Sequence, residues 1–231
     1  MEKRMEHIAI TIDGNRRWAK EKNIPTKEGH AAGLIAVRKL ADEMNAAGFK
    51  MLTVWVFSTE NWKRSEEEVS DYMELLRLFF QKYIDNAQTS DMRVCVIGDL
   101  ARLDVKLRKC IEVLTELTKD KKGMLLNIAV NYGGRDDIVR ATKKIITDGI
   151  NPDEINETLF SKYLDTAGLP DPDLLVRTGG DLRLSNFMLW QFAYTEFYYC
   201  EKYWPDFRFD DLKEAINSFG KRERRFGGRQ G

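Results

Sequence analysis

The sequence predicts an α/β fold with one open, mostly parallel sheet of about six strands flanked by helices. Short runs of β-branched and apolar residues alternate with longer stretches of helical periodicity, and nothing repeats at a fixed solenoid period. Five prolines and short turn clusters leave no linker, so we expect residues 1–231 to form a single domain. Because such sheets bind ligands beyond the carboxyl ends of their strands, a functional site is expected there.

Five strands and six helices can be placed by their patterns. The predicted strands cover residues 7–12, 50–57, 92–97, 125–130 and 174–176, with the continuous apolar character of strands buried on both faces. The predicted helices cover residues 15–22, 29–47, 66–87, 103–117, 137–146 and 210–222, and Gly48 ends the second as a C-cap residue. The apolar face of the helix at 66–87 is wider than one-sided packing requires, so a second apolar contact is expected, with core packing as the alternative.

Composition excludes several classes of protein. Lys and Arg number 37, as do Asp and Glu, so no global field attracts nucleic acid or an anionic bilayer, and any positive site must be local. No apolar stretch approaches the roughly 20 residues that span a bilayer, and the N-terminus has no apolar signal segment, so we expect a cytoplasmic protein. The three cysteines lie far apart, which favours reduced core thiols, and two histidines argue against a zinc cluster.

Two polar clusters follow the first two predicted strands. The segment from Asp13 to Trp18 joins a hard carboxylate, a glycine and the forked guanidinium of Arg17 at a helix start. These groups suit a phosphate and magnesium, although simple helix capping is the alternative. The segment 58–64 exposes Trp62 beside hydrogen-bonding groups and Arg64, which favours a binding loop over a capped turn.

Further polar clusters follow later strands, at 131–136 and at 177–186. In the second of these, Arg177 and Arg183 flank a diglycine turn with Ser185 adjacent, so the backbone could wrap a diphosphate that two guanidiniums neutralise. A solvated turn is the alternative. Glu196 lies in an apolar stretch, where an unpaired carboxylate is costly, so we expect it to contact a cation or a basic side chain. Together these features predict a site for two diphosphates with an apolar tail.

Other phosphate motifs are absent from the sequence. There is no GxxxxGK[ST] P-loop and no GxGxxG after a strand, so nucleotide hydrolysis and dinucleotide redox chemistry have no support. Asp210, Asp211 and Glu214 form a DDxxE-like string, superficially like the metal-binding aspartates of all-α prenyl synthases. The α/β alternation contradicts that fold, and the string is predicted to begin the last helix.

Several long runs, in order, make the chain resemble a cis-prenyltransferase of the undecaprenyl diphosphate synthase family. They are IDGNRRWAK from Ile12, GHAAG from Gly29, FSTENWKR from Phe57, NYGGRDD from Asn131, RTGGDLRLSNFMLWQ from Arg177, WPDF from Trp204 and RERRFGG from Arg222. The resemblance extends from His7 to Gly228. It implies an open, mostly parallel sheet around a hydrophobic tunnel, assembled as a homodimer, and the helix at 66–87 is our candidate for the tunnel wall.

The resemblance also implies a reaction. C1 of an allylic diphosphate, expected to be farnesyl diphosphate, is joined to C4 of isopentenyl diphosphate, and loss of a proton leaves a cis double bond. Repetition gives a polyprenyl diphosphate, with undecaprenyl diphosphate as the expected product. Mg²⁺ is the implied cofactor. A long prenyl diphosphate is barely soluble, so transient contact with a membrane is expected when product is released.

Site residues are implied position by position. Asp13 would bind Mg²⁺ and assist departure of the diphosphate, Glu196 would complete the magnesium site, and Asn61 would accept the proton. Because an amide is a poor base, diphosphate oxygen or water is expected to take part. The implied substrate-binding residues are Gly14, Asn15, Arg16, Arg17, Trp18, His30 and Arg64 for the allylic substrate, Ser58, Thr59, Glu60 and Trp62 with Asn61 in a closing loop, and Arg177, Arg183, Leu184 and Ser185 for isopentenyl diphosphate.

The sequence departs from the family pattern at several positions. Thr26 stands where the family usually has an arginine, so one phosphate contact is missing or is taken up by Lys27. Ile12, Arg16 and the pair Asp181-Leu182 also differ, without loss of an essential group. Val56 stands where a small residue is frequent near the tunnel, which leads to the hypothesis of a shortened product.

The basic tail at 221–231 resembles an RGG-like nucleic-acid segment when it is read alone. Its shortness and the zero net charge argue against that interpretation. Residues 225–227 fit the RxG element with which the family reaches toward the dimer partner. Two alternatives to an active polyprenyl synthase remain: a non-catalytic partner subunit, which the presence of Asp13, Asn61 and Glu196 disfavours, and a phosphate-binding α/β protein with unrelated substrates.

Overall fold

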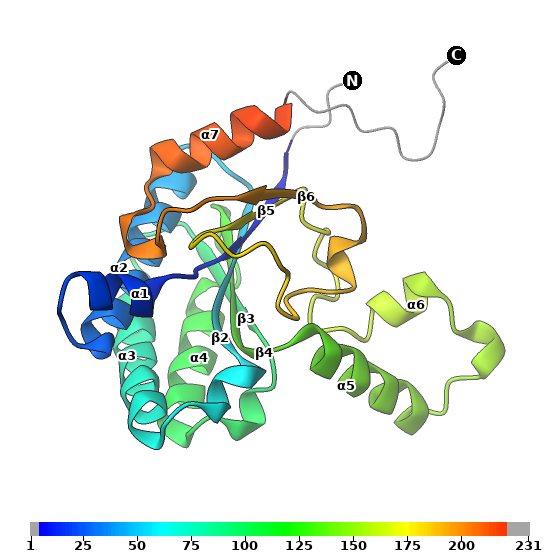
Figure 1. Ribbon diagram of the computed structural model, residues 1–231. Helices are drawn as coiled ribbons and strands as arrows, with labels where there is room; N and C mark the ends of the chain where they lie inside the picture. Colours follow the sequence, from blue (N-terminus) through cyan, green and yellow to red (C-terminus); the bar gives the residue numbers. More distant parts are fainter. Residues whose placement is uncertain (1–4, 221–231) are drawn as a thin grey trace, which may run out of the picture.

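The computed structural model describes residues 5–220 and contains a six-stranded sheet in which every strand pair is parallel (Figure 1). This confirms the predicted fold class. The strands are β1 (His7–Thr11), β2 (Met51–Ser58), β3 (Arg93–Ile97), β4 (Leu125–Tyr132), β5 (Leu174–Arg177) and β6 (Glu196–Tyr199), in the order β3-β4-β2-β1-β5-β6. The predicted tail 221–231, including the 225–227 element and the last two residues of the predicted helix 210–222, lies outside the described residues.

The helices are α1 (Asn15–Glu21), α2 (Thr26–Ala46), α3 (Glu66–Asp85), α4 (Val105–Thr118), α5 (Gly134–Thr147), α6 (Glu157–Ser161) and α7 (Phe209–Gly220). Side-chain caps explain two of the starts: Ser65 accepts a hydrogen bond from the backbone N–H of Glu68 in α3, and Asp104 accepts one from that of Leu107 in α4. The helix predicted at 29–47 begins earlier in the structure, at Thr26, directly after the N-cap residue Pro25, whose ring fixes φ near the helical value.

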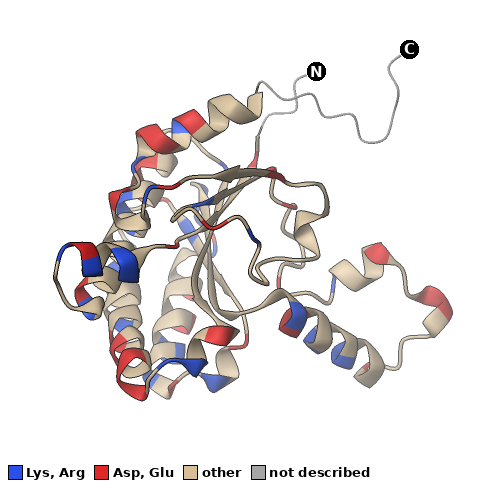
Figure 2. Cartoon of the chain, in the orientation of Figure 1, with Lys and Arg blue, Asp and Glu red and all other residues tan. Residues whose placement is uncertain are grey.

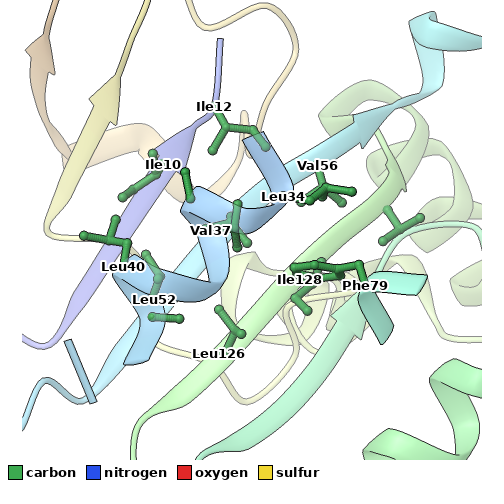
Figure 3. Close-up of a cluster of buried hydrophobic side chains, with 14 of the residues drawn as sticks. Ile10, Ile12, Leu34, Val37, Leu40, Leu52, Val56, Phe79, Leu126 and Ile128 are labelled. Carbon is green, nitrogen blue, oxygen red and sulfur yellow. The ribbon is translucent and has the colours of Figure 1, made fainter. Parts of the chain in front are cut away.

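The sheet carries a large core on one face and a smaller one on the other. The strands alternate between these cores, since Ile8 and Ile10 pack with α2, α3, α4 and α7 while Ala9 faces the opposite side. Figure 3 shows the larger core, where aliphatic side chains of α2 and the sheet interlock. In the smaller core the rings of Trp55 and Phe187 stack at 4.7 Å.

The wide apolar face of α3 is accounted for by core packing. The side chains that bury it are Tyr72, Met73, Leu76, Phe79, Phe80 and Tyr83. Among the α3 residues, Tyr72 is the one that also lines the cavity described below. The tunnel wall expected along this helix is therefore filled by protein side chains in this structure, and the cavity ends near the first turns of α3.

Charged residues lie mainly on the helices and connecting segments, with both signs mixed, while the strands are largely free of them (Figure 2). Cys95, Cys110 and Cys200 are free cysteines, and each is half-buried where the sequence favoured a core position. None of the helices in the described part of the chain is long and apolar enough to cross a membrane.

His7 in β1 makes the stability of the fold depend on pH. Desolvation by burial lowers the pKa of His7 to about 4, against 6.5 in an unfolded chain. Between these values the unfolded state binds the additional proton, so stability rises with pH and is lost as the pH falls from about 6.5 to 4. We expect this group to remove about 3 kcal/mol of unfolding free energy over that range.

The test compares urea unfolding of the protein and His7→Gln from pH 7.5 to 4. Gln can replace the hydrogen bonds of the ring, which joins the Pro170 carbonyl to the Thr53 hydroxyl, but it does not titrate. The wild-type free energy should fall more steeply than that of the variant. Parallel curves would contradict the assignment.

Candidate active site

A cavity of about 880 Å³ opens at the carboxyl ends of β1, β2 and β5. Its lining carries six arginine or lysine side chains against three carboxylates, so a chain of zero net charge has a local positive site here. The lining residues are Thr11, Ile12, Asp13, Gly14, Asn15, Arg16, Arg17, Lys20, Ile24, Thr26, His30, Trp55, Val56, Phe57, Ser58, Glu60, Asn61, Arg64, Tyr72, Arg177, Asp181, Arg183 and Ser185. Aromatic and aliphatic side chains from β2 and α3 form part of this lining, so the site is both cationic and apolar.

Asp13 lies just beyond the carboxyl end of β1, where residues distant in the sequence hold it in place. The Thr178 hydroxyl, just past β5, accepts a hydrogen bond from the Asp13 N–H at 3.0 Å and donates one to its carbonyl at 2.8 Å. The next residue, Gly14, has φ 105° and lies so close to Tyr203 that an added Cβ would stand 2.7 Å from the ring. Only glycine fits that backbone, and this fixes the direction in which Asp13 enters the cleft.

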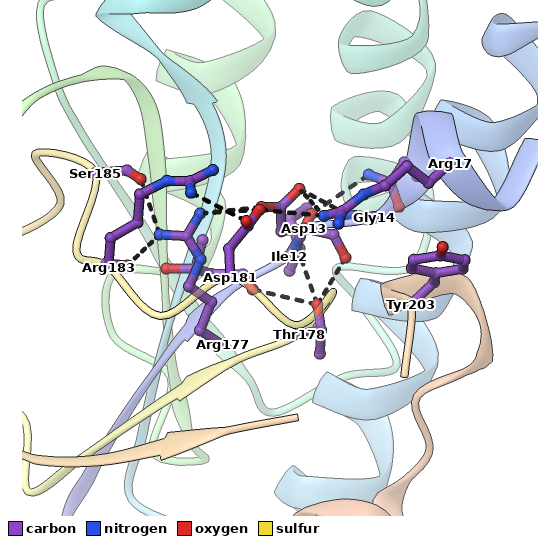
Figure 4. A network of polar contacts seen from close by, with 12 residues as sticks. Ile12, Asp13, Gly14, Arg17, Arg177, Thr178, Asp181, Arg183, Ser185 and Tyr203 are labelled. Atoms are coloured by element: carbon purple, nitrogen blue, oxygen red, sulfur yellow. Dashed lines mark hydrogen bonds and ion pairs between the residues drawn. The ribbon is translucent and has the colours of Figure 1, made fainter. Parts of the chain in front are cut away.

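Arg177, the last residue of β5, joins Asp13 to the segment that follows β5 (Figure 4). Its Nη2 donates to Asp13 Oδ2 at 3.0 Å, and its Nη1 donates to Ser185 Oγ at 2.8 Å and to the Arg183 carbonyl. The Arg177 side chain is only 4% exposed. Such a buried, planar donor presents a fixed charge to the cleft.

Burial by itself raises the pKa of Asp13, but the hydrogen bond and positive charge of Arg177 outweigh it and hold that pKa below its ordinary value. The Arg17 guanidinium, 3.4 Å from the carboxylate, acts in the same direction. Asp13 is therefore ionised at neutral pH. A hard anionic oxygen in a cationic cleft is a suitable ligand for a small divalent cation.

Asp181 is a carboxylate whose importance the sequence did not reveal. Its oxygens lie 3.0 Å from Arg183 Nη1, 3.3 Å from Arg17 Nη2 and 3.8 Å from Arg177 Nη2. It therefore joins arginines from α1, β5 and the segment after β5 into one cluster, drawn in Figure 4. In the sequence it is one acid in a polar turn between Arg177 and Arg183, and Arg17 becomes its neighbour only through the β1–β5 pairing.

A second cationic cluster forms on the α1, α2 and α3 side of the cleft. Glu68 Oε1 lies 3.0 Å from Arg64 Nη1, 3.2 Å from His30 Nε2 and 3.8 Å from Arg16 Nε. Burial lowers the pKa of His30, so its imidazole is neutral at pH 7 and Nε2 donates to the carboxylate.

The segment after β2 is an ordered turn of 3₁₀ helix, Thr59–Lys63. Asn61 caps it, because its Oδ1 accepts the Ser58 N–H at 3.0 Å. The Trp62 indole donates to Asn131 Oδ1 at 2.7 Å, and the Arg102 guanidinium lies over the ring at 4.2 Å. The predicted cluster at 131–136 thus anchors this turn from behind the cleft, and it supplies no lining residue.

The model of the family described as putative undecaprenyl diphosphate synthase matches residues 11–227. The chain belongs to that family. It is 47% identical to an isoprenyl transferase of Clostridium perfringens, over 98% of this chain and 91% of the relative, and 45% identical to one of Bacillus cereus, over 96% and 88%. The protein is a transferase, which confirms the predicted enzyme class.

Two solved structures share its fold. Lavandulyl diphosphate synthase from Lavandula x intermedia, in complex with dimethylallyl diphosphate, has a TM-score of 0.92 and 40% identity, with 96% of this chain and 98% of that chain covered. A probable undecaprenyl diphosphate synthase from Campylobacter jejuni has a TM-score of 0.82 and 34% identity, with 97% and 99% covered. The predicted family and fold are confirmed by these matches.

The cleft of this prenyltransferase brings together most of the residues predicted from sequence. Those that line it are Asp13, Gly14, Asn15, Arg16, Arg17, His30, Ser58, Glu60, Asn61, Arg64, Arg177, Arg183 and Ser185. Four predicted substrate-binding residues do not: Trp18 donates to Asp206, Thr59 donates to Glu60, Trp62 packs toward Asn131, and Leu184 packs against the smaller core.

Glu196 lies far from Asp13 within one chain of this prenyltransferase. It begins β6 and pairs in register with Leu174 of β5, which pairs with Ile8 of β1. Asp13 lies five residues beyond Ile8, about 16 Å along the strand direction. The two carboxylates therefore occupy opposite ends of the sheet. The sequence does not predict this separation, because β6 is a four-residue strand that is defined by its pairing with β5.

The structure also shows whether Lys27 can replace the arginine that the family usually has at the position of Thr26. Thr26 lines the cleft, but Lys27 does not, because its ammonium group lies 2.8 Å from Asp71 and 2.7 Å from Glu74 on α3. Lys27 is thus committed elsewhere and does not take up the missing contact. Lys20, on α1, is the lysine that reaches the cleft.

Proposed function

We propose that the protein condenses isopentenyl diphosphate repeatedly onto an allylic diphosphate, farnesyl diphosphate in the first instance, to give a cis-polyprenyl diphosphate. The observation that carries this proposal is one cleft with two cationic clusters and an apolar part of its lining, with Asp13 at the mouth of β1 between them. Two clusters suit two diphosphates, and apolar side chains suit prenyl tails.

The residues of the cleft divide between the substrates. Arg16, His30 and Arg64 of the second cluster, together with Arg17 of the Asp181 cluster, would hold the allylic diphosphate, whose negative charge grows as the C1–O bond breaks. Arg177, Arg183 and Ser185 would hold isopentenyl diphosphate. Guanidiniums fixed in advance stabilise developing charge without reorganisation, which is the largest expected contribution to the rate.

The proton is expected to leave toward a diphosphate oxygen or water rather than to Asn61. The Asn61 carbonyl oxygen already accepts the Ser58 N–H, so its place is taken in the capping turn. Glu60 and Asn61 of the same turn line the cleft, where the turn would limit entry of water to the cationic carbon.

The oxygen donors of the cleft suit Mg²⁺ when the phosphate oxygens of a bound substrate are counted with them. Asp13 presents a hard, ionised oxygen, and no group of three or more His, Cys, Asp or Glu in the described part of the chain could hold a metal by itself. Mg²⁺ is commonly held by one or two carboxylates together with substrate phosphates, so Asp13 is its proposed ligand. When bound, the ion would neutralise charge on the leaving diphosphate.

We also propose that the protein works in the cytoplasm as a homodimer and contacts a membrane transiently when product leaves. Apolar side chains on the surface near β6, such as Leu182 and Tyr194, each 75% exposed, support a role in association. A non-catalytic partner subunit is disfavoured, because Asp13 and its arginines are assembled.

Product length tests this function. Val56 is buried and lines the cleft. Its backbone carbonyl accepts a hydrogen bond from the Tyr72 hydroxyl at 2.6 Å, so we expect these two residues to close the inner end of the cleft. Purified protein with Mg²⁺, farnesyl diphosphate and isopentenyl diphosphate should give a ladder of cis products that stops short of undecaprenyl diphosphate. Val56→Ala should lengthen the ladder, because a smaller side chain opens the floor.

Val54→Ala is the matched control, since Val54 is buried in the same strand, undergoes the same substitution and does not line the cleft. A full undecaprenyl product from wild type, unchanged in Val56→Ala, would refute the length assignment. If no condensation product forms and a farnesyl chain adds nothing to the affinity for pyrophosphate, the prenyl function itself is wrong.

A further inference from the structure

One carboxylate holds the whole α1–α3 side of the cleft together. A single oxygen, Glu68 Oε1, faces cationic or donor groups from three parts of the chain: Arg16 on α1, His30 on α2 and Arg64 just before α3. All three partners line the cleft, and Glu68 stands behind them. Glu68 does not line the cleft itself, so it can influence a ligand there only through Arg16, His30 and Arg64.

Helix stability alone does not account for this placement. Three acids, Glu66, Glu67 and Glu68, occupy the first turn of α3, where the helix dipole favours negative charge. Glu66 and Glu67 are exposed, as that role allows. Glu68 is instead drawn inward, with its side chain 16% exposed. Partial burial of a carboxylate is costly without partners, so its contacts with the cations explain the position.

The arrangement leaves the cluster short of negative charge. Two guanidiniums and an imidazole share one carboxylate oxygen, and Arg16 remains 61% exposed and free to turn. A diphosphate offers more charge and several oxygens, and it can accept paired bonds from a guanidinium. It would outcompete Glu68 for Arg64 and Arg16 when it enters the cleft.

We propose that Glu68 is a positioning residue that acts as an internal counter-anion: it holds Arg16, His30 and Arg64 in the empty cleft and yields them to the diphosphate of the substrate. This proposal rests on the function proposed above. After each condensation the carboxylate would recover its partners and so favour departure of pyrophosphate. Glu68 thereby lowers affinity for diphosphate in exchange for faster turnover.

The test measures binding of inorganic pyrophosphate by calorimetry, without metal or prenyl substrate. Glu68→Gln keeps the shape and removes the competing charge, so pyrophosphate should bind about 10-fold more tightly than to wild type. Glu67→Gln is the matched control, with the same charge change in the same helical turn and no expected effect. Glu68→Asp retains the charge and should restore affinity to within about 3-fold of wild type.

Turnover gives a second readout that a purely structural role would not produce. In Glu68→Gln both kcat and KM for the allylic substrate should fall, and inhibition by pyrophosphate should strengthen. If wild type binds pyrophosphate but Glu68→Gln binds it equally or more weakly, Glu68 only supports the arginines and the proposal is wrong. If wild type does not bind pyrophosphate at all, the diphosphate site and thus the proposed function are overturned instead.

Discussion

Asp13→Asn is expected to lower kcat for condensation by about 10²–10³-fold while the protein stays folded. Asparagine keeps the size of the side chain and can still accept a hydrogen bond, but it removes the negative charge between Arg17 and Arg177. It also removes the ionised oxygen proposed to hold Mg²⁺, so the magnesium concentration that supports half-maximal rate should rise.

The measurement is steady-state turnover at several magnesium concentrations, with thermal melting to confirm the fold. Asp206→Asn is the matched control: Asp206 also lies near α1, where it accepts the Trp18 indole N–H at 2.9 Å, but it does not line the cleft. A rate for Asp13→Asn within about 5-fold of wild type would be incompatible with the role given to this carboxylate, because such a change is under 1 kcal/mol.

Arg177→Lys is expected to raise KM for isopentenyl diphosphate by about 10- to 100-fold, with a smaller change in KM for the allylic substrate. Arg177 bonds Asp13, Ser185 and the Arg183 carbonyl at once through two nitrogens of a rigid fork. A lysine ammonium carries the charge but cannot reproduce that geometry. Loss of one hydrogen bond to a charged group costs about 1.5–3 kcal/mol, which corresponds to this range.

Initial rates with each substrate varied in turn separate the two KM values. Arg135→Lys is the control, because Arg135 is exposed on α5 and does not line the cleft. Equal effects on both substrates would mean that Arg177 organises the cleft as a whole and does not select isopentenyl diphosphate.

Local signals predicted the elements that are long or that have clear ends. The strand at 50–57 and the helix at 66–87 were placed within about two residues, because continuous apolar runs and strong periodicity are properties of the sequence alone. β6 was not placed as a strand: it has four residues, begins with Glu196, and owes its structure to pairing with β5 at the edge of the sheet. α6, five residues long, gave no periodic signal for the same reason of length.

The residues of the cleft were predicted better than their partners. Arg17, Arg177 and Arg183 stand in recognisable polar clusters at strand ends, so their meeting at one cleft followed from their position. Glu68 and Asp181 are ordinary acids in the sequence, and what distinguishes them is the three cationic or donor groups that each one faces in space. Arg64 and Arg177 stand four residues before these acids, and Arg183 stands two residues after Asp181. Arg16, His30 and Arg17 come from other elements, so no local pattern could identify the full set of partners.

The sequence by itself determined the α/β class, the family and the segments that contain the chemistry, because periodicity and motif order are written along the chain. The tertiary structure alone decided which charges meet. Pairing of β1 with β5 brought Arg177 to Asp13, and the same register carried Glu196 to the opposite end of the sheet. Electrostatic interactions depend on distance in space, and only the folded chain determines that distance.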